Sequence, residues 1–349
     1  MKPKIISWNV RGLNEGDKRL KVRNLLRQWK TDIVCLQETK LVFVSNSLVR
    51  SLWGCHFVDW CHLASRGASG GILIMWDRRI VEKIDVYVGE FVVACSFRSV
   101  ADNFSWAFAG VYGPNLDSLR SSLWDELAGL HSWWELPWCI GGDFNVTCFP
   151  AERSRDVRLN AAMTEFSDFI FEQDLMDLPL AGGPFTWSNN QEIPSWSRLD
   201  RFLVSPEWEV KFPGSLQKRL PRLCSDHFPI LLDCGGVHWG PRPFKFENMW
   251  LKAEGFVDKV RLWWEFYRFQ GSPSFIFSQK LKALKNDIKR WNEQEFGNVE
   301  LRKKLHMEEL CALDNLEEQH GLTSEEKARK CGVIRDLESS ILQEEISWR

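Results

Sequence analysis

The chain has 349 residues, 44 % of them hydrophobic, and a formal net charge of −2. This length predicts about two domains with ample apolar residues for a core, and the balanced charge excludes a protein that binds nucleic acid through bulk positive charge. No apolar run reaches the ~18 residues of a membrane span, and the start "MKPKIISWNV" is not a signal peptide. We therefore expect a soluble intracellular protein, nuclear or cytoplasmic, with no membrane partner and no protein partner that can be inferred.

Short strand-like runs alternate with amphipathic helical runs from residue 1 to about 233. Strands in close succession at 70–113 indicate antiparallel pairing, and the strand–helix alternation around them indicates crossovers. We predict an α/β protein with two mixed, largely antiparallel sheets packed face to face and helices outside. The expected strands are 4–10, 32–38, 70–77, 80–88, 90–100, 104–113, 137–145, 184–188, 196–204, 215–222 and 228–233, and the expected helices are 17–30, 45–53, 117–132 and 160–172.

The character of the sequence changes after Asp233. The stretch "CGGVHWGPRPFKFENMW" is rich in glycine and proline and predicts a linker at 234–243. From 244 to 349 the chain is strongly charged, with apolar residues recurring at helical spacing, so we expect a C-terminal helical extension there. Residues 1–233 would then form the domain that carries the chemistry.

Polar side chains follow several of the predicted strands, at the point where each strand runs into a turn. They are Asn9 in "SWNVRG", Glu38 in "CLQETK", Asp143 and Asn145 in "IGGDFN", and Asp200 in "SRLDRF". The ends of neighbouring strands are adjacent in space, so these groups can converge on one rim. Asp143 and Asn145, two residues apart, are expected on the same strand face. Asn and Asp also cap turns, but five such positions together favour a site.

The segment "SDHFP" adds Asp226 and His227 just before an apolar strand. An extended chain sends consecutive side chains to opposite faces, so Asp226 is a poor partner for His227. We expect the carboxylate that orients His227 to be Asp200 instead, which leaves Asp226 free for a metal or for water.

The oxygen ligands available at this rim indicate the kind of metal. Glu38 and Asp226, together with Asn9 and Asp143, supply hard oxygen donors, which favour Mg²⁺. Zinc is disfavoured because Cys and His residues are never spaced as ligand pairs. The ten cysteines include no CxxC pair and read as reduced core residues.

The ordered segments "WNVRG", "QETK", "SGG", "VYGPN", "GGDFN", "TWSNN", "SRLDR" and "SDHFP" resemble the endonuclease/exonuclease/phosphatase superfamily over residues 4–233. Within it, "GASGGILIMWD", "VYGPN" and "GGPFTW" resemble the endonuclease of plant LINE-type (non-LTR) retrotransposon polyproteins. The C-terminal segments "RPFKFENMW" and "EEISWR" are similar to the part that leads towards the reverse transcriptase, although no YxDD-like stretch is present. The resemblance implies a four-layer α/β sandwich and hydrolysis of phosphodiesters with Mg²⁺, or with Mn²⁺ as the alternative.

The resemblance also implies a role for each matching residue. Glu38, helped by Asn9, would hold the metal, and Asp143 would activate water that Asn145 positions. Asp200 would orient His227, which would bind a phosphate oxygen. The remaining implied roles are contact with the phosphate for Tyr112 and Asn115, and support of the site for Thr186, Ser225 and Asp226.

Three functions are compatible with these residues. The first is a metal-dependent endonuclease that nicks duplex DNA, and "VYGPN" and "TWSNN" favour it. The second is a phosphatase of a phosphoinositide or another small phosphoester, since a fold alone does not fix a substrate. The third is an inactive, truncated retrotransposon relic. Target preference would depend on loops such as 151–160, whose Arg153, Arg155 and Arg158 could meet phosphates or remain solvated.

Overall fold

The computed structural model describes residues 2–67, 69–155, 158–235, 246, 250–251, 253, 255–270, 273–292 and 299–348. The chain divides into two compact units. The first contains residues 1–238 together with 315–321, and the second contains residues 239–314 and 322–349. The two units are described separately below, and the first carries all the residues predicted for the site.

The first unit contains a seven-stranded mixed sheet. Its strands, in spatial order, are β10 (Leu180–Ala181), β14 (Leu216–Arg219), β15 (Ile230–Asp233), β1 (Lys4–Asn9), β2 (Ile33–Gln37), β4 (Ile72–Asp77) and β3 (Val58–Leu63). Strands β1 and β2 run parallel, as do β10 and β14, and the other pairs are antiparallel. The central strands β1, β2 and β4 are almost wholly buried, as expected for apolar runs covered on both faces.

A second mixed sheet of six strands faces the first. Its strands, in spatial order, are β5 (Val81–Val88), β6 (Val92–Ser99), β7 (Ser105–Tyr112), β8 (Trp138–Asp143), β13 (Asp200–Val204) and β9 (Met176–Asp177). Only the β7–β8 pair is parallel among these six strands. A short hairpin of β11 (Trp187–Ser188) and β12 (Trp196–Ser197) forms a separate two-stranded sheet.

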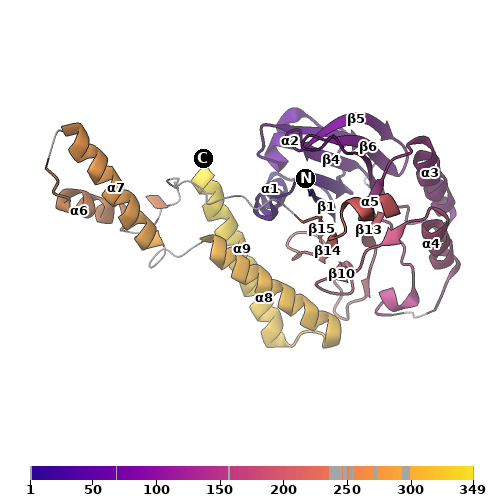
Figure 1. Cartoon of the computed structure of the whole chain (residues 1–349). Helices are drawn as coiled ribbons and strands as arrows, with labels where there is room; N and C mark the ends of the chain where they lie inside the picture. The colour runs from indigo at the N-terminus through magenta and orange to yellow at the C-terminus, as the bar shows by residue number, and fades with distance from the viewer. Residues whose placement is uncertain are drawn as a thin grey trace. The chain divides into compact units, whose positions relative to one another are not determined.

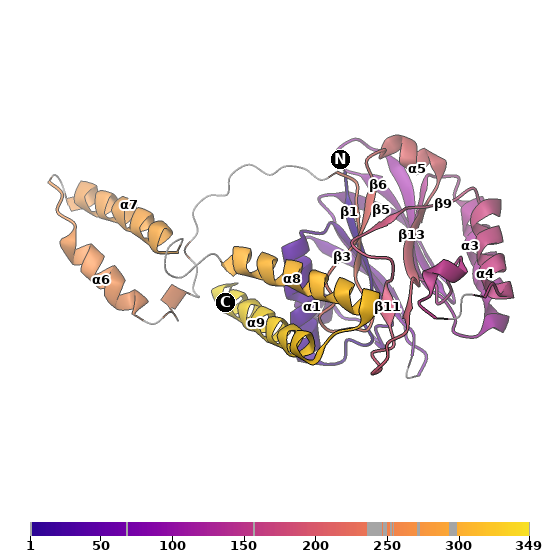
Figure 2. The same cartoon turned by 90° about the horizontal axis from the view of Figure 1, so that it is seen from below.

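Helices cover the outer faces of the two sheets, giving four layers (Figures 1 and 2). Apolar side chains of both sheets meet in one buried cluster, which includes Ile74 and Phe108. A second cluster lies between the six-stranded sheet and α3 and α4, and on the other side Trp29 of α1 packs edge-on against Trp8. The helices of this unit are α1 (Gly16–Trp29), α2 (Asn46–Leu52), α3 (Arg120–Trp133), α4 (Ala161–Glu172) and α5 (Pro206–Lys211), with 3-10 turns at Asp117–Leu119 and Pro150–Glu152. The predicted α/β sandwich is confirmed.

One detail of the predicted strand order is wrong, and some short elements were not predicted. The strands at 70–77 and 80–88 were expected to pair as neighbours, but β4 belongs to the seven-stranded sheet and β5 to the six-stranded one. The short turn between β4 and β5 therefore carries the chain from one sheet to the other. The sequence also did not predict β3, α5 or the two-residue strands β9 and β10, because such short elements lack a recognisable apolar period.

The second unit is helical where it is described. Its helices are α6 (Phe256–Phe266), α7 (Pro273–Trp291), α9 (Ser324–Trp348) and most of α8 (Val299–His320). Phe256, Ile288 and Trp291 form a small buried cluster with Trp250. Residues 236–243 of the predicted linker lie outside the described residues. None of the described helices combines the length and the apolar character that crossing a membrane requires.

The end of α8 belongs to the first unit rather than the second. Within that unit, the guanidinium of Arg219 donates to the side-chain oxygen of Asn315 at 2.5 Å and forms an ion pair with Glu318. Arg219 and Glu318 are almost fully buried there. The first compact unit is therefore not limited to the residues before Asp233.

Strand β13, which presents Asp200, is anchored by a buried ionic cluster. The side chain of Arg201 is completely buried and contacts Glu152 at 2.8 Å and Asp177 at 2.7 Å. Arg198 contacts the same two carboxylates at 3.3 and 2.6 Å. Four charges thus compensate one another, which a buried arginine requires. Both arginines of the "SRLDR" segment therefore hold the strand in place.

Replacing Arg201 should reveal this anchoring. Arg201→Met leaves two carboxylates with one cation between them, so we expect a loss of roughly 3 kcal/mol in the free energy of unfolding of the first unit. The measurement is urea unfolding of the full chain. Arg98→Met, which removes an exposed pair with Glu82, is the control and should cost about 1 kcal/mol or less. Equal effects of the two substitutions would contradict the anchoring role.

Candidate active site

Strand register brings the predicted residues to one rim. In the six-stranded sheet, Tyr112 of β7 is directly opposite Asp143 of β8, which is directly opposite Asp200 of β13. In the facing sheet, Asn9 ends β1, and Glu38 follows the last residue of β2. The amide of Asn9 reaches across to Asp143, donating to Oδ2 at 2.9 Å. The rims of the two sheets therefore meet at these side chains.

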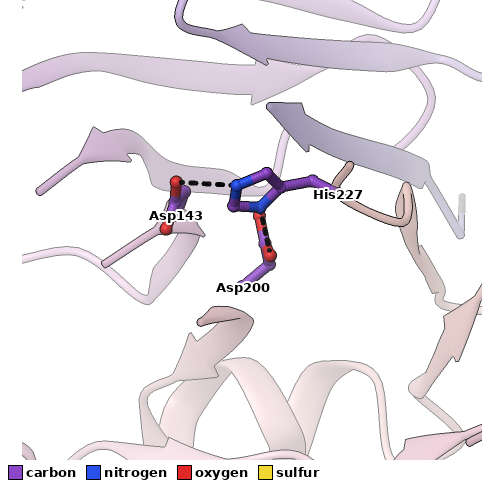
Figure 3. Close-up of side chains that lie close together, drawn as sticks. All are labelled: Asp143, Asp200 and His227. Atoms are coloured by element: carbon purple, nitrogen blue, oxygen red, sulfur yellow. Dashed lines mark hydrogen bonds and ion pairs between the residues drawn. The ribbon is translucent and has the colours of Figure 1, made fainter. Parts of the chain in front are cut away.

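His227 lies between two carboxylates of the opposite sheet (Figure 3). Its Nδ1 is 2.9 Å from Oδ2 of Asp200, and its Nε2 is 3.7 Å from Oδ2 of Asp143. All three side chains are buried, with at most 3 % exposed. The pairing predicted between Asp200 and His227 is thus present, and Asp143 lies on the other ring nitrogen.

Two hydroxyl groups fix the backbone around this trio. Thr186 Oγ1 accepts the N–H groups of Leu199 and Asp200, both at 2.9 Å. Ser225 Oγ donates to the carbonyl of Asn9 at 2.7 Å and accepts the N–H of His227 at 3.1 Å. Each hydroxyl ties the chain beside one member of the Asp200–His227 pair, so both predicted supporting residues contact the site.

The buried charges shift the pKa values of the trio. Burial lowers the pKa of His227, but Asp200 and Asp143 outweigh it and raise that pKa to about 9. Burial raises the pKa of Asp143 to about 6, against the opposing effect of His227. Between these values Asp143 is ionised while His227 keeps its proton. Such a split is typical of residues with separate acid and base roles.

Glu38 lies beside the trio in a more polar setting. Its backbone is in the left-handed region, with φ of 50°, and its side chain is 6 % exposed. The carboxylate contacts Arg11 at 3.4 Å and Lys40 at 3.3 Å, and accepts from the Asn9 amide at 3.3 Å. Asn9 therefore connects Glu38 with Asp143. The left-handed backbone turns Glu38 out of the strand alternation and towards the rim.

Asp226 and His227 have different partners. Asp226 Oδ2 accepts the indole N–H of Trp187 at 3.0 Å, and Oδ1 is 3.2 Å from Nε of Arg11. The imidazole of His227 faces the other way, into the trio. The expectation that these neighbours serve different groups agrees with this geometry. Arg11, Lys40 and Trp187 were not predicted, although "WNVRG", "QETK" and "TWSNN" contain them.

The expectation for Asn145 is wrong in its geometry. Strand β8 ends at Asp143, and Asn145 follows in the left-handed region with φ of 53°. The two residues are therefore joined by a turn, in which the N–H of Asn145 donates to Asp143 Oδ1 at 2.9 Å, and they do not share a strand face. The side-chain amide of Asn145 donates to the carbonyl of Gly113 at 2.7 Å. This bond ties Asn145 to the loop after Tyr112.

Tyr112 and Asn115 differ in their relation to the site. Burial and the carboxylates of Glu38 and Asp143 raise the pKa of Tyr112, so its phenol stays protonated at neutral pH. Asn115 is exposed, three residues further along the loop, and lines a pocket together with Tyr112. The structure thus brings Tyr112 to the carboxylates and leaves Asn115 at the edge of the site.

Two groups of side chains could hold a metal ion. Within the described residues, Asp143, Asp200 and His227 offer ligand atoms within 4.8 Å of one another. A metal there would need the imidazole deprotonated, against the pKa shift that its carboxylates cause. Glu38, with the Asn9 amide beside it, offers the hard oxygen donor that a divalent cation such as Mg²⁺ prefers. Its neighbours Arg11 and Lys40 have side chains that are 49 % and 35 % exposed.

The endonuclease/exonuclease/phosphatase family profile matches residues 6–227 of this chain. This match covers more than half of the sequence, and the chain belongs to that family. Its members are hydrolases of phosphodiester or phosphoester bonds and depend on a divalent metal. The chain is therefore placed among metal-dependent phosphoester hydrolases by family.

Solved structures share this fold. The endonuclease domain of TRAS1, a telomere-specific non-LTR retrotransposon, superposes with a TM-score of 0.51 at 14 % identity, covering 66 % of this chain and 97 % of that domain. The AP endonuclease LMAP from Leishmania major gives a TM-score of 0.50 at 20 % identity, covering 66 % of this chain and 87 % of that protein. At these identities the likeness concerns the sandwich fold alone.

The shifted pKa of His227 can be measured directly. In EDTA, the imidazole should titrate near pH 9, and Asp200→Asn should lower its pKa markedly by removing the largest raising influence. Because the folded pKa exceeds the usual 6.5, the His227 pairing stabilises the fold fully below pH 6.5 and progressively less up to pH 9. NMR of ring-labelled histidine tests both statements. Asp226→Asn is the control, and a larger effect of that variant would contradict the pairing.

Proposed function

We propose that this protein is a Mg²⁺-dependent DNA endonuclease that nicks duplex DNA, as in LINE-type retrotransposition of the plant kind. The observation that carries the proposal is the buried trio in which His227 lies 2.9 Å from Asp200 and 3.7 Å from Asp143, an arrangement that raises the pKa of the imidazole. A base beside a retained positive charge suits attack of water on a phosphodiester anion. Asp143 as the base and His227 as the positive charge can therefore act together at neutral pH.

The residues of the trio divide the reaction between them. Asp143 takes a proton from the attacking water, and Asn145, held by Asp143 and Gly113, positions that water. His227, oriented by Asp200, holds a non-bridging phosphate oxygen and stabilises the charge that develops on it. Tyr112 stays protonated and donates to the phosphate, with Asn115 contacting it from the loop. Thr186 and Ser225 keep the strand ends in register.

Glu38 and Asn9 would hold the metal, and Asp226 would contribute through its position beside Arg11. A divalent ion, Mg²⁺ or in its place Mn²⁺, would act as a Lewis acid that polarises the phosphate. Its positive charge would stabilise the departing oxygen. Arg11 and Lys40, which pair with Glu38, can turn their charges to substrate phosphates, since both side chains are partly exposed.

DNA is proposed as the substrate because two of the solved structures that share the fold are an endonuclease domain of a retrotransposon and an AP endonuclease. We also propose that residues 1–233 form the nuclease domain, with 234–243 as linker and 244–349 as a helical connector region. Residues 315–321 group with the first unit through Arg219, so experiments on activity should use the full chain.

The metal assignment and the nuclease function are tested together. The full chain should nick supercoiled plasmid with Mg²⁺ and not with EDTA. Glu38→Gln should lower the nicking rate on the order of 10³-fold, because Lewis-acid stabilisation by the metal is worth several kcal/mol. Glu38→Gln should also weaken Mn²⁺ binding, followed by electron paramagnetic resonance. Glu82→Gln, at an exposed glutamate, is the control.

The possible outcomes separate the alternatives. Nicking by Glu38→Gln at the unmodified rate would remove Glu38 as the principal ligand. Hydrolysis of p-nitrophenyl phosphate without plasmid nicking would favour a phosphatase. Activity on neither substrate would indicate an inactive relic.

A double-mutant cycle tests the separation of Asp226 from His227. Because Asp200 and His227 act as a unit, Asp200→Asn combined with His227→Ala should nick little more slowly than His227→Ala, which loses about 10²- to 10⁴-fold. Asp226→Asn, which acts elsewhere, should combine nearly multiplicatively with His227→Ala and be partly rescued by more magnesium. Nicking rates at two magnesium concentrations provide the measurement. Coupling of His227 to Asp226 and not to Asp200 would reverse the assignment.

A further inference from the structure

A pocket of about 240 Å³ opens beside Tyr112, at the same rim as the candidate site. Three loops line it: the one before β4, the β5–β6 turn, and the segment after β7. Tyr112 and Asn115 belong to both the pocket and the proposed phosphate site. A molecule held at the phosphate site could therefore extend directly into the pocket.

The walls of this pocket are fixed to the active site by backbone hydrogen bonds. On one side, the carbonyl of Phe91 accepts the N–H of Tyr112 at 3.0 Å, and the carboxylate of Glu126 accepts the N–H groups of Glu90 and Phe91, each at 3.1 Å. The turn that carries Phe91 is thus held by α3. This wall is set in position before any ligand arrives.

The opposite wall is tied to the segment that follows Glu38. The carbonyls of Gly70 and Gly71 accept the N–H groups of Lys40 and Thr39 at 3.0 and 3.1 Å. Gly71 has a φ of 91°, and a Cβ there would be 2.5 Å from Thr39 Oγ1, so the close approach requires glycine. Both walls therefore keep a fixed distance from the residues proposed to act on the phosphate.

The lining is apolar with a polar rim. Leu116 and Leu119 have exposed fractions of 64 % and 42 %, although large apolar side chains favour burial. At the rim, Arg66 and Glu90 form an exposed pair at 2.9 Å and offer both donors and acceptors. Apolar walls with hydrogen-bonding groups at the edge suit a planar heterocycle, which presents faces to the walls and polar atoms to the rim.

Size limits the occupant to one ring system. Sites for drug-sized ligands measure roughly 300–1,000 Å³, so a volume of about 240 Å³ suits a single base. We propose that the pocket takes one unpaired base of the strand being cut, adjacent to the phosphate under attack. This rests on the proposed nuclease function and deepens it, because the enzyme would then select sites where a base can leave the duplex.

The first experiment combines a change in the protein with a change in the DNA. A nicked site is mapped on a short duplex, and each nucleotide flanking the cut is replaced in turn by a base-free tetrahydrofuran residue. With the unmodified chain, loss of the base at one flanking position should lower kcat/KM about tenfold, since holding a base is worth about 1–3 kcal/mol. With Leu116→Gln, kcat/KM on the intact duplex should fall similarly, and removing that base should then cost little.

Leu262→Gln is the matched control, because Leu262 of α6 is equally exposed at 64 % and lies outside the pocket lining. This variant should behave like the unmodified chain on every duplex. The proposal is overturned if no flanking base matters. It is also overturned if removing the base costs the same in Leu116→Gln as in the unmodified chain.

A binding measurement separates failure of the pocket from failure of the nuclease. A series of duplexes, each with 2-aminopurine at a different position, is mixed with the chain in EDTA. Fluorescence should rise at one position as the base leaves the stack. The rise should be smaller with Leu116→Gln and unchanged with Leu262→Gln. A rise without nicking under Mg²⁺ would overturn the nuclease and keep the pocket. No rise at any position, or the same rise with Leu116→Gln, would overturn the pocket even where nicking is observed.

Discussion

The contact between His227 and Asp200 is the interaction on which the rest of the site depends. A protonated imidazole in a region that excludes water is tolerated only when negative charge is close, and Asp200 at 2.9 Å supplies it. The two residues come from different sheets, so their contact requires the rims of both sheets to meet. The register of Asp143 opposite Asp200 then places the second carboxylate on the other ring nitrogen. One buried pairing thus sets the alignment of the two halves of the sandwich.

Asn9 joins this buried trio to the more polar region around Glu38, whose partners Arg11 and Lys40 are partly exposed. Its amide donates to both Asp143 and Glu38, and its own side-chain oxygen accepts the N–H of Arg11 at 3.1 Å. Within the trio, charges are fixed and their pKa values are shifted. On the other side, Glu38 is neutralised by partly exposed cations that can exchange partners. A single carboxamide therefore keeps Asp143, the proposed base, and Glu38, the proposed metal ligand, at a fixed separation.

Much of this arrangement follows from the sequence, and the exceptions have physical causes. Long apolar runs such as β1, β2 and β7 were predictable because burial on one or both faces imposes a recognisable pattern. Alternation also predicted that Asp226 and His227 would diverge, which left Asp200 as the partner. The same rule failed for Asn145, because the chain leaves the strand at Asp143 and turns through a left-handed residue. Left-handed positions at non-glycine residues give no periodic signal.

Arg201 shows a different limit of sequence reasoning. Charged side chains are normally assigned to the surface, and only the tertiary arrangement of Glu152 and Asp177 makes a fully buried arginine tolerable. The carboxylates come from a three-residue 3-10 turn and from a two-residue strand, both too short for a period to be detected in the sequence. Loops contribute to the other end of the site as well, at Tyr112 and Asn115. The sandwich core therefore holds the buried trio, and the loops that surround it supply the residues that we propose contact the substrate.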